Sequence, residues 1–180
     1  MGETILILGG ARSGKSRMAA KLAQGLPPVT YVATATVDQA DPEMVTRIAR
    51  HQTDRPAEWT TLEVPRELEG TLSSLAQREG SLVIDCATLW LTNLILGLGG
   101  GQELDNEAVL EKVRRAASAL RGPGRVIWVS NEVGSGIVPM GVLTRRFVDL
   151  QGLVNQELAE HCDQVYLCVA GIPLRIKGSG

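Results

Sequence analysis

The hydrophobic residues of this chain fall into short runs that alternate with longer amphipathic stretches. Apolar or β-branched runs predict strands at 4–8, 29–34, 59–64, 82–85 and 125–130, and the stretches between them predict helices at 15–25, 41–52, 65–78, 88–96, 106–120 and 142–161. Two closing strands, at 164–170 and 174–177, are predicted on either side of Gly171-Ile172-Pro173. Strands that alternate with helices form mostly parallel sheets covered by helices, so the pattern predicts an α/β fold.

Organisation along the chain points to one unit. The glycine-rich residues 97–101 predict a loop, but no repeat, linker or shift in composition divides the sequence. We therefore expect a single domain over residues 1–180, a length that buries a substantial core.

Composition and charge exclude several classes of function. The apolar fraction is 44% and the net charge is −2, so the basic surface typical of nucleic-acid binding is not expected. No apolar run approaches the ~20 residues that span a membrane, and the N-terminus lacks a signal-peptide layout. We expect a cytoplasmic protein with no nucleic-acid partner and no membrane span. The three cysteines, Cys86, Cys162 and Cys168, show no C-x-x-C spacing and are expected in the core.

The first predicted strand runs directly into a phosphate-binding motif. Its residues are Gly9-Gly10-Ala11-Arg12-Ser13-Gly14-Lys15-Ser16, which match G-x-x-x-x-G-K-S between a strand and a helix. The glycines let the backbone approach a polyphosphate, Lys15 supplies positive charge, and Ser16 offers a hydroxyl ligand for Mg²⁺. With the strand and helix pattern, this motif predicts a P-loop NTPase-type three-layer sandwich. Helices should cover both faces of a mostly parallel sheet that ends in a short antiparallel strand pair.

Further candidate residues follow predicted strands, at the edge where a parallel sheet binds its ligand. Asp85 ends an apolar strand, where a P-loop protein places a carboxylate near Mg²⁺. The same pattern would result if Asp85 were an ordinary polar residue at the end of a strand. Thr34-Ala35-Thr36 offers hydroxyls to a nucleotide or a substrate. The loop at 131–139 could orient a substrate or simply form a turn.

His51 admits two interpretations from the residues alone. At helical spacing it shares a face with Met44 and Ile48, which favours a histidine at the edge of a core-facing stripe. Arg47 and Arg55 lie nearby, and guanidinium groups favour a neutral, nucleophilic imidazole and can hold phosphates. The second interpretation would make His51 a nucleophile that attacks phosphorus.

Several segments taken together resemble one family. They are the motif at 9–16, Tyr31-Val32-Ala33-Thr34-Ala35, the segment from Arg47 to His51, Arg55-Pro56-Ala57-Glu58-Trp59, the loop at 131–139, residues 152–159 and Gly171-Ile172-Pro173. Over essentially the whole chain, in the same order, the sequence resembles the bifunctional adenosylcobinamide kinase / adenosylcobinamide-phosphate guanylyltransferases of cobalamin biosynthesis.

This resemblance implies two reactions at one P-loop site. ATP or GTP first phosphorylates adenosylcobinamide, and GTP then transfers GMP to that phosphate through a guanylylated histidine, which yields adenosylcobinamide-GDP and pyrophosphate. The matching position is His51, with Lys15 as the second catalytic residue, so the resemblance reverses the structural interpretation of His51. Nucleotide contacts are implied at 9–16, Thr34, Ala35, Thr36, Gln52, Thr53, Asp54, Arg55, Glu63 and Asp85, and Mg²⁺ contacts at Ser16 and Asp85. The resemblance also implies a homotrimer.

Two departures and two alternatives accompany this interpretation. The family often has Glu where Asp85 stands, so a metal role and a guanine-binding role both stay open for this carboxylate. Arg50 replaces a second histidine found in relatives, which leaves His51 as the candidate nucleophile. One alternative is a P-loop kinase for another small metabolite, with a structural His51. The other is a nucleotide-binding switch, against which the absence of an N-K-x-D-like guanine motif counts.

Overall fold

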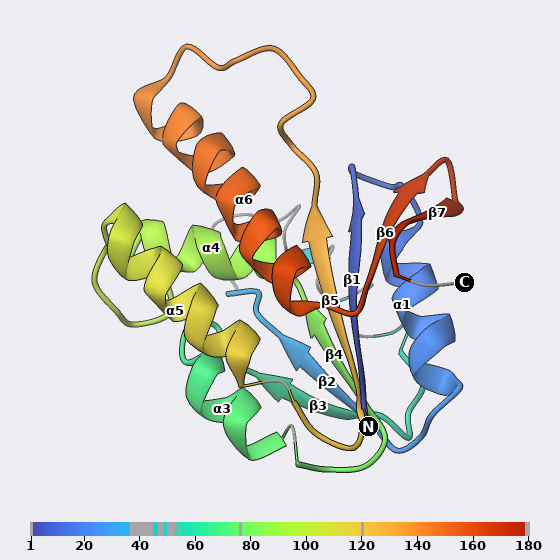
Figure 1. Ribbon diagram of the computed structural model, residues 1–180. Helices are drawn as coiled ribbons and strands as arrows, with labels where there is room; N and C mark the ends of the chain where they lie inside the picture. Colours follow the sequence, from blue (N-terminus) through green and yellow to red (C-terminus); the bar gives the residue numbers. More distant parts are fainter. Residues whose placement is uncertain are drawn as a thin grey trace.

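A computed structural model describes residues 2–36, 45–46, 49, 53, 55–75, 77–119 and 121–178 of the chain. Within this part, seven strands form one sheet in the order β3-β2-β4-β5-β1-β6-β7 (Figure 1). The predicted helix at 41–52 lies mostly outside the described residues.

The sheet is parallel except at one edge. Its strands are β1 (Glu3–Gly9), β2 (Val29–Ala33), β3 (Thr60–Glu63), β4 (Ser81–Asp85), β5 (Arg125–Asn131), β6 (Gln164–Val169) and β7 (Ile172–Lys177). β6 and β7 pair antiparallel, and the other neighbouring strands pair parallel. The predicted fold class is therefore confirmed, and the strand positions agree with the prediction to within about two residues.

Helices cover both faces of the sheet. The described helices are α1 (Lys15–Gln24), α3 (Leu68–Leu75), α4 (Ala87–Ile95), α5 (Asn106–Ser118) and α6 (Val142–His161). Among them, α1 lies on one face and α3 to α6 lie on the other (Figure 1). Alternate residues of β1 divide accordingly: Ile5 and Ile7 pack in the cluster under α1, whereas Leu6 and Leu8 pack in the cluster under the other helices. Burial on both sides explains why the central strands read as continuous apolar runs.

The predicted helix at 65–78 begins later than expected, because Arg66 has another role. Arg66 is buried, and its guanidinium donates to the carbonyls of Asn93 at 2.5 Å, Leu98 at 3.0 Å and Gln102 at 2.7 Å. Its own carbonyl accepts from the Trp90 indole at 2.8 Å. These bonds hold the residue outside the helix, which starts at Leu68, and they anchor the predicted glycine-rich loop against α4.

The C-terminal strand pair turns more tightly than predicted. Val169 pairs with Ile172, so only Ala170 and Gly171 form the turn, with φ values of 52° and 81°. Positive φ at both central positions is the signature of a type I′ hairpin turn. The prediction that Gly171-Ile172-Pro173 separates the two strands is therefore wrong by two residues, because Ile172 and Pro173 already belong to β7. A proline is tolerated there because β7 is an edge strand.

No helix in the described part of the chain is both long and apolar enough to cross a membrane.

Candidate nucleotide-binding site

The phosphate-binding loop connects β1 to α1, as the motif predicted. Gly14 has φ of 95°, a left-handed conformation that glycine adopts without strain. Lys15 is buried at the start of α1, and its ammonium donates to the carbonyl of Gly10 at 3.0 Å. The backbone N–H of Ser13 donates to the same carbonyl at 3.3 Å. The loop therefore folds around its own lysine, which is held inside it.

The strand order brings the predicted carboxylates to the same edge of the sheet. Ala33, the last residue of β2, pairs with Glu63 of β3 on one side and with Asp85 of β4 on the other. On the P-loop side, Gly9 pairs with Asn131, the last residue of β5. Because parallel strands end together, Glu63, Asp85 and Asn131 all lie at the edge where the P-loop begins.

A cavity of about 340 Å³ lies beside the P-loop helix. It is lined by Ser16, Arg17, Ala19, Ala20, Tyr31, Arg55, Pro56, Trp59, Val83 and Asp85. The lining includes both the Ser16 hydroxyl of the P-loop motif and the Asp85 carboxylate that ends β4. It therefore brings together three of the predicted site residues, Ser16, Arg55 and Asp85.

Tyr31 organises the wall of this cavity. Its hydroxyl donates to Asp85 Oδ2 at 2.6 Å, and the Arg55 guanidinium lies 3.8 Å from the centre of its ring. The Trp59 ring stacks on the Tyr31 ring at a centroid distance of 6.2 Å. Burial, followed by the nearby charge of Asp85, raises the pKa of Tyr31 far above its ordinary value of 10.0. The tyrosine therefore stays protonated and orients the carboxylate as a hydrogen-bond donor.

Hydrogen bonds with Cys86 and Asn93 hold the Thr34–Thr36 segment in place. Thr34 is fully buried, and its hydroxyl donates to the Cys86 carbonyl and accepts from the Cys86 N–H, each at 2.8 Å. The amide of Asn93 donates to the Thr34 carbonyl at 2.7 Å, while its oxygen accepts from the Thr36 hydroxyl at 3.2 Å. The Thr34 side chain thus joins the ends of β2 and β4, so its hydroxyl is already engaged within the protein.

The other predicted site residues are more dispersed. Ala11, Arg12, Thr53 and Glu63 are exposed, and none of the four lines the cavity. The Thr53 hydroxyl donates to the Ala49 carbonyl at 3.0 Å. Three predicted residues, His51, Gln52 and Asp54, lie outside the described residues.

Three contributors, Tyr31, Trp59 and Asn93, were not singled out from the sequence. Tyr31 and Trp59 form the aromatic wall, but the pairing of Tyr31 with Asp85 depends on β2 lying next to β4. A sequence signal did exist for Asn93, because it is a polar residue within the apolar run of α4 and buried polar groups are usually hydrogen-bonded.

Asn131 combines a fixed backbone with an unused side-chain atom. Its N–H donates to the Thr88 hydroxyl at 2.9 Å, and its carbonyl accepts from the Asn155 amide at 3.0 Å. Within the described residues its buried Oδ1 has no hydrogen-bond partner. This acceptor lies at the end of the strand beside the P-loop.

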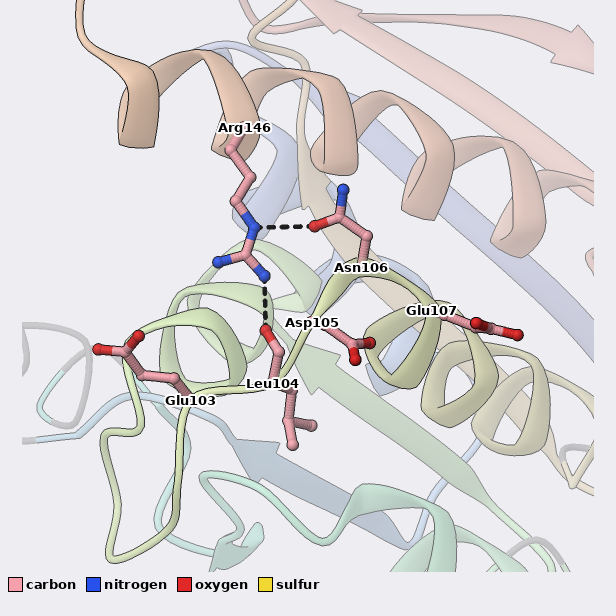
Figure 2. Close-up of a pocket in the computed structure, with 6 residues that line it drawn as sticks. All are labelled: Glu103, Leu104, Asp105, Asn106, Glu107 and Arg146. Carbon is pink, nitrogen blue, oxygen red and sulfur yellow. Dashed lines mark hydrogen bonds between the residues drawn. The ribbon is translucent and has the colours of Figure 1, made fainter.

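A second hollow, of about 600 Å³, lies at the start of α5 and is shown in Figure 2. It is lined by Glu103, Leu104, Asp105, Asn106, Glu107 and Arg146. Arg146 of α6 donates to Asn106 Oδ1 at 2.8 Å and to the Leu104 carbonyl at 2.5 Å. These bonds connect the two helices, and the hollow shares no lining residue with the P-loop cavity.

Solved structures with similar folds include nucleotide-hydrolysing proteins. A prototypical ATPase of a type III secretion system from pathogenic bacteria has a TM-score of 0.55 at 12% identity, over 93% of this chain and 51% of that one. The type III secretion ATPase EscN of enteropathogenic E. coli scores 0.56 at 12% identity, over 94% and 43%. A protein from Pyrococcus horikoshii OT3 scores 0.55 at 12% identity, over 99% and 88%. This chain thus spans about half the length of the secretion ATPase chains or less, and the likeness shows the fold alone.

The sheet order, the motif between β1 and α1 and the adjoining cavity define a P-loop NTPase-type α/β protein. Residues 5–176 match the family described as cobinamide kinase / cobinamide phosphate guanyltransferase. The bifunctional adenosylcobalamin biosynthesis protein CobP of Pseudomonas aeruginosa is 51% identical over 96% of both chains. CobU of Salmonella typhimurium is 40% identical over 96% of this chain and 99% of that one. The chain therefore belongs to the cobinamide kinase / cobinamide phosphate guanyltransferase family, and the sequence-based expectation of this family is confirmed.

Proposed function

We propose that this chain carries out both reactions of its family at the P-loop. It would phosphorylate the alcohol of adenosylcobinamide with ATP or GTP, and would then transfer GMP from GTP to that phosphate. The observation that carries the proposal is the family match over residues 5–176, which includes the intact motif at 9–16. Because both reactions consume nucleoside triphosphates, we also propose a cytoplasmic location. We further propose that residues 1–180 form a single catalytic domain.

In both reactions, the P-loop would stabilise negative charge on the phosphates. The backbone N–H groups of the loop and the start of α1 form an anion-binding arrangement. Lys15, which donates to Gly10 in the structure, would turn its ammonium to the β- and γ-phosphates. In the kinase step, the oxygen of the substrate alcohol forms a bond to the γ-phosphorus and its proton is released to solvent, while the bond from the γ-phosphorus to the β-phosphate oxygen breaks and the nucleoside diphosphate leaves.

The donor set beside the loop fits a magnesium ion bound with the nucleotide. Among the described residues, no three His, Cys, Asp or Glu side chains are grouped to hold a metal. Mg²⁺ keeps several waters and binds few protein oxygens beside phosphates, so the Ser16 hydroxyl would hold the ion beside the nucleotide, and the Asp85 carboxylate of the same cavity is the alternative second ligand. When bound, the ion would neutralise phosphate charge.

The cavity walls favour a guanine-binding role for Asp85. Tyr31 already donates to one oxygen of this carboxylate, and Trp59 and Arg55 supply flat surfaces near it. A carboxylate can accept hydrogen bonds from the N1–H and the 2-amino group of guanine, while flat groups stack on a base. We therefore assign the base to this cavity, with Mg²⁺ binding by Asp85 as the alternative that the nucleotide test in the Discussion separates.

His51 would carry the guanylyl group between the two substrates. Its nitrogen attacks the α-phosphorus of GTP, the bond to the β-phosphate oxygen breaks, and pyrophosphate leaves. The phosphate of the corrinoid then attacks the same phosphorus and releases the histidine, so each step makes one bond and breaks one. His51 lies outside the described residues, but Arg55 is four residues later and lines the cavity. Four residues of chain span at most about 14 Å, which supports a nucleophile near the nucleotide.

We further propose that the protein forms a homotrimer, as the family resemblance implies. Apolar residues exposed after β5 support self-association, since Ile137 is 98% and Met140 is 93% exposed. Val138, Val142 and Leu143 in the same segment are also more than half exposed, and an exposed group of apolar residues is typical of an interaction surface. Light scattering at several protein concentrations tests the proposal, and a monomer at all of them would contradict it.

Two single substitutions test the catalytic roles. Lys15→Ala should reduce both reactions at least ~100-fold, because each depends on charge stabilisation at the same loop. His51→Ala should abolish guanylyl transfer while corrinoid phosphorylation continues. Lys21→Ala, an exposed lysine in the last turn of α1, is the matched control and should leave both rates unchanged. Equal retention of both activities by the His51 variant would contradict the nucleophile assignment.

A further inference from the structure

The turn between β6 and β7 contacts the phosphate-binding loop directly. The backbone N–H of Gly171 donates to the carbonyl of Ser13 at 2.9 Å. In a type I′ turn that joins Val169 to Ile172, the strand ladder does not require this N–H. The Gly171 N–H is therefore available to the P-loop, although the loop lies near the N-terminus of the chain and the hairpin near its C-terminus.

This contact fixes the direction of one peptide group of the P-loop. The bond between Ser13 and Gly14 is trans, and in a trans peptide the C=O and the N–H point in opposite directions. Holding the Ser13 carbonyl toward Gly171 therefore turns the Gly14 N–H away from the hairpin. Successive N–H groups of a P-loop must face the same anion, so the orientation of this one affects nucleotide affinity.

Close packing prevents the two segments from separating or rotating. A Cβ added to Gly14 would lie 2.9 Å from the Cα of Gly171, and one added to Gly9 would lie 2.8 Å from the carbonyl oxygen of Cys168. The hairpin thus contacts the loop at both of its motif glycines. At its far end, Lys177 donates to the carbonyls of Ala159 and Glu160 in the last turn of α6, at 2.6 and 3.1 Å.

We propose that Gly171 is a positioning residue for the nucleotide: its N–H holds the Ser13–Gly14 peptide so that the P-loop is organised before the triphosphate binds. The inference rests on the proposed nucleotide-binding function of the loop. It gives the exposed C-terminal hairpin a role in both reactions, because both use the same loop. Affinity for the triphosphate should depend on this bond, whereas the KM for the corrinoid should not.

The test removes the single donor and leaves the side chains unchanged. Cys168 allows residues 1–167, as a thioester, to be ligated to a synthetic peptide of residues 168–180 in which an ester replaces the Gly171 amide. The matched control carries an ester at Gly178, whose neighbours Asp163 and Gln164 lie at the other end of the hairpin. An all-amide protein made by the same ligation is the reference.

Two readouts separate this inference from the proposed function. The Gly171 ester should weaken binding of a non-hydrolysable GTP analogue by about five- to tenfold, the loss typical of one hydrogen bond, and the Gly178 ester should not. It should also shift the ¹H–¹⁵N signal of Gly14 in the ligand-free protein. Equal affinity of the Gly171 ester and the reference would overturn the inference, as would an unchanged Gly14 signal. Failure of the reference itself to bind the analogue would overturn the proposed function and this inference together.

Discussion

At the scale of single residues, the site combines the phosphate-binding loop with the Asp85 carboxylate, which Tyr31 orients through a hydrogen bond of 2.6 Å. The motif at 9–16 lies between β1 and α1, and Asp85 ends β4 beside the cavity, as expected. The hydrogen bond between Tyr31 and Asp85 was not predictable, because it depends on two strands that are neighbours in the sheet but not in the sequence. The proposed role of His51 rests on family resemblance, since helical spacing alone favoured a structural histidine.

The proposed guanine-binding role of Asp85 makes a specific prediction about nucleotide choice. Asp85→Asn should reduce kcat/KM for GTP by about tenfold or more, because a charge-assisted hydrogen bond to the base is lost. The loss with ITP, which lacks the 2-amino group, should be smaller, so the preference for GTP over ITP should fall. Steady-state guanylyl transfer with both nucleotides measures this ratio.

Tyr31→Phe is the matched variant for this experiment, because it removes only the donor that orients the carboxylate. Its effect should have the same direction as that of Asp85→Asn and a smaller size. A GTP to ITP ratio that stays constant in Asp85→Asn while the Mg²⁺ requirement rises would contradict the guanine assignment and favour the metal role.

At the scale of elements, strands were easier to predict than helix starts and turns. The apolar runs of β1 and β4 are explained by burial on both faces, and their short length between turn residues identifies them as strands. The start of α3 was misplaced because Arg66 forms hydrogen bonds with residues up to Gln102, a tertiary effect that local sequence does not reveal. The two-residue turn at Ala170 and Gly171 was likewise hidden, because a proline in an edge strand resembles a loop residue.

Arg66 should be the largest single contributor to the position of the glycine-rich loop. Replacing it with alanine leaves three carbonyls without their charged donor, so we expect a loss of about 3 kcal/mol in the free energy of unfolding. Urea denaturation measures the change, with the exposed Arg78→Ala as the matched control. A destabilisation of Arg66→Ala no larger than that of the control would contradict this role.

At the scale of the whole molecule, the Asp163 carboxylate connects the segment before β6 to β1, and it makes the stability of the fold depend on pH in the acid range. Asp163 Oδ2 accepts from the Thr4 N–H and from its hydroxyl, each at 2.8 Å. The backbone hydrogen bond from Thr4 is the main cause that holds the pKa of Asp163 below its ordinary value of 3.8. A carboxyl whose folded pKa is lowered stabilises the fold above that ordinary value, and this stability is lost as pH falls toward the folded pKa.

We therefore expect Asp163→Asn to reduce stability near neutral pH and to flatten its decline below about pH 4. Thermal unfolding of the two proteins between pH 3 and pH 7 measures the difference, which should shrink toward the acid end. Asp149→Asn, an exposed carboxylate of α6, is the control. A Tm difference between Asp163→Asn and the unsubstituted protein that stays constant over this range would show that the ionised form makes no special contribution.

The central proposal, which the family match over residues 5–176 supports, is that GTP guanylylates this chain on His51. The most direct measurement is intact mass spectrometry of the purified protein after exposure to GTP and Mg²⁺ without corrinoid. The account predicts a gain of one guanylyl group that maps to His51, disappears in acid and is absent from His51→Ala. A protein that transfers GMP to the corrinoid phosphate without forming this adduct, or that carries it on another residue, would contradict the account.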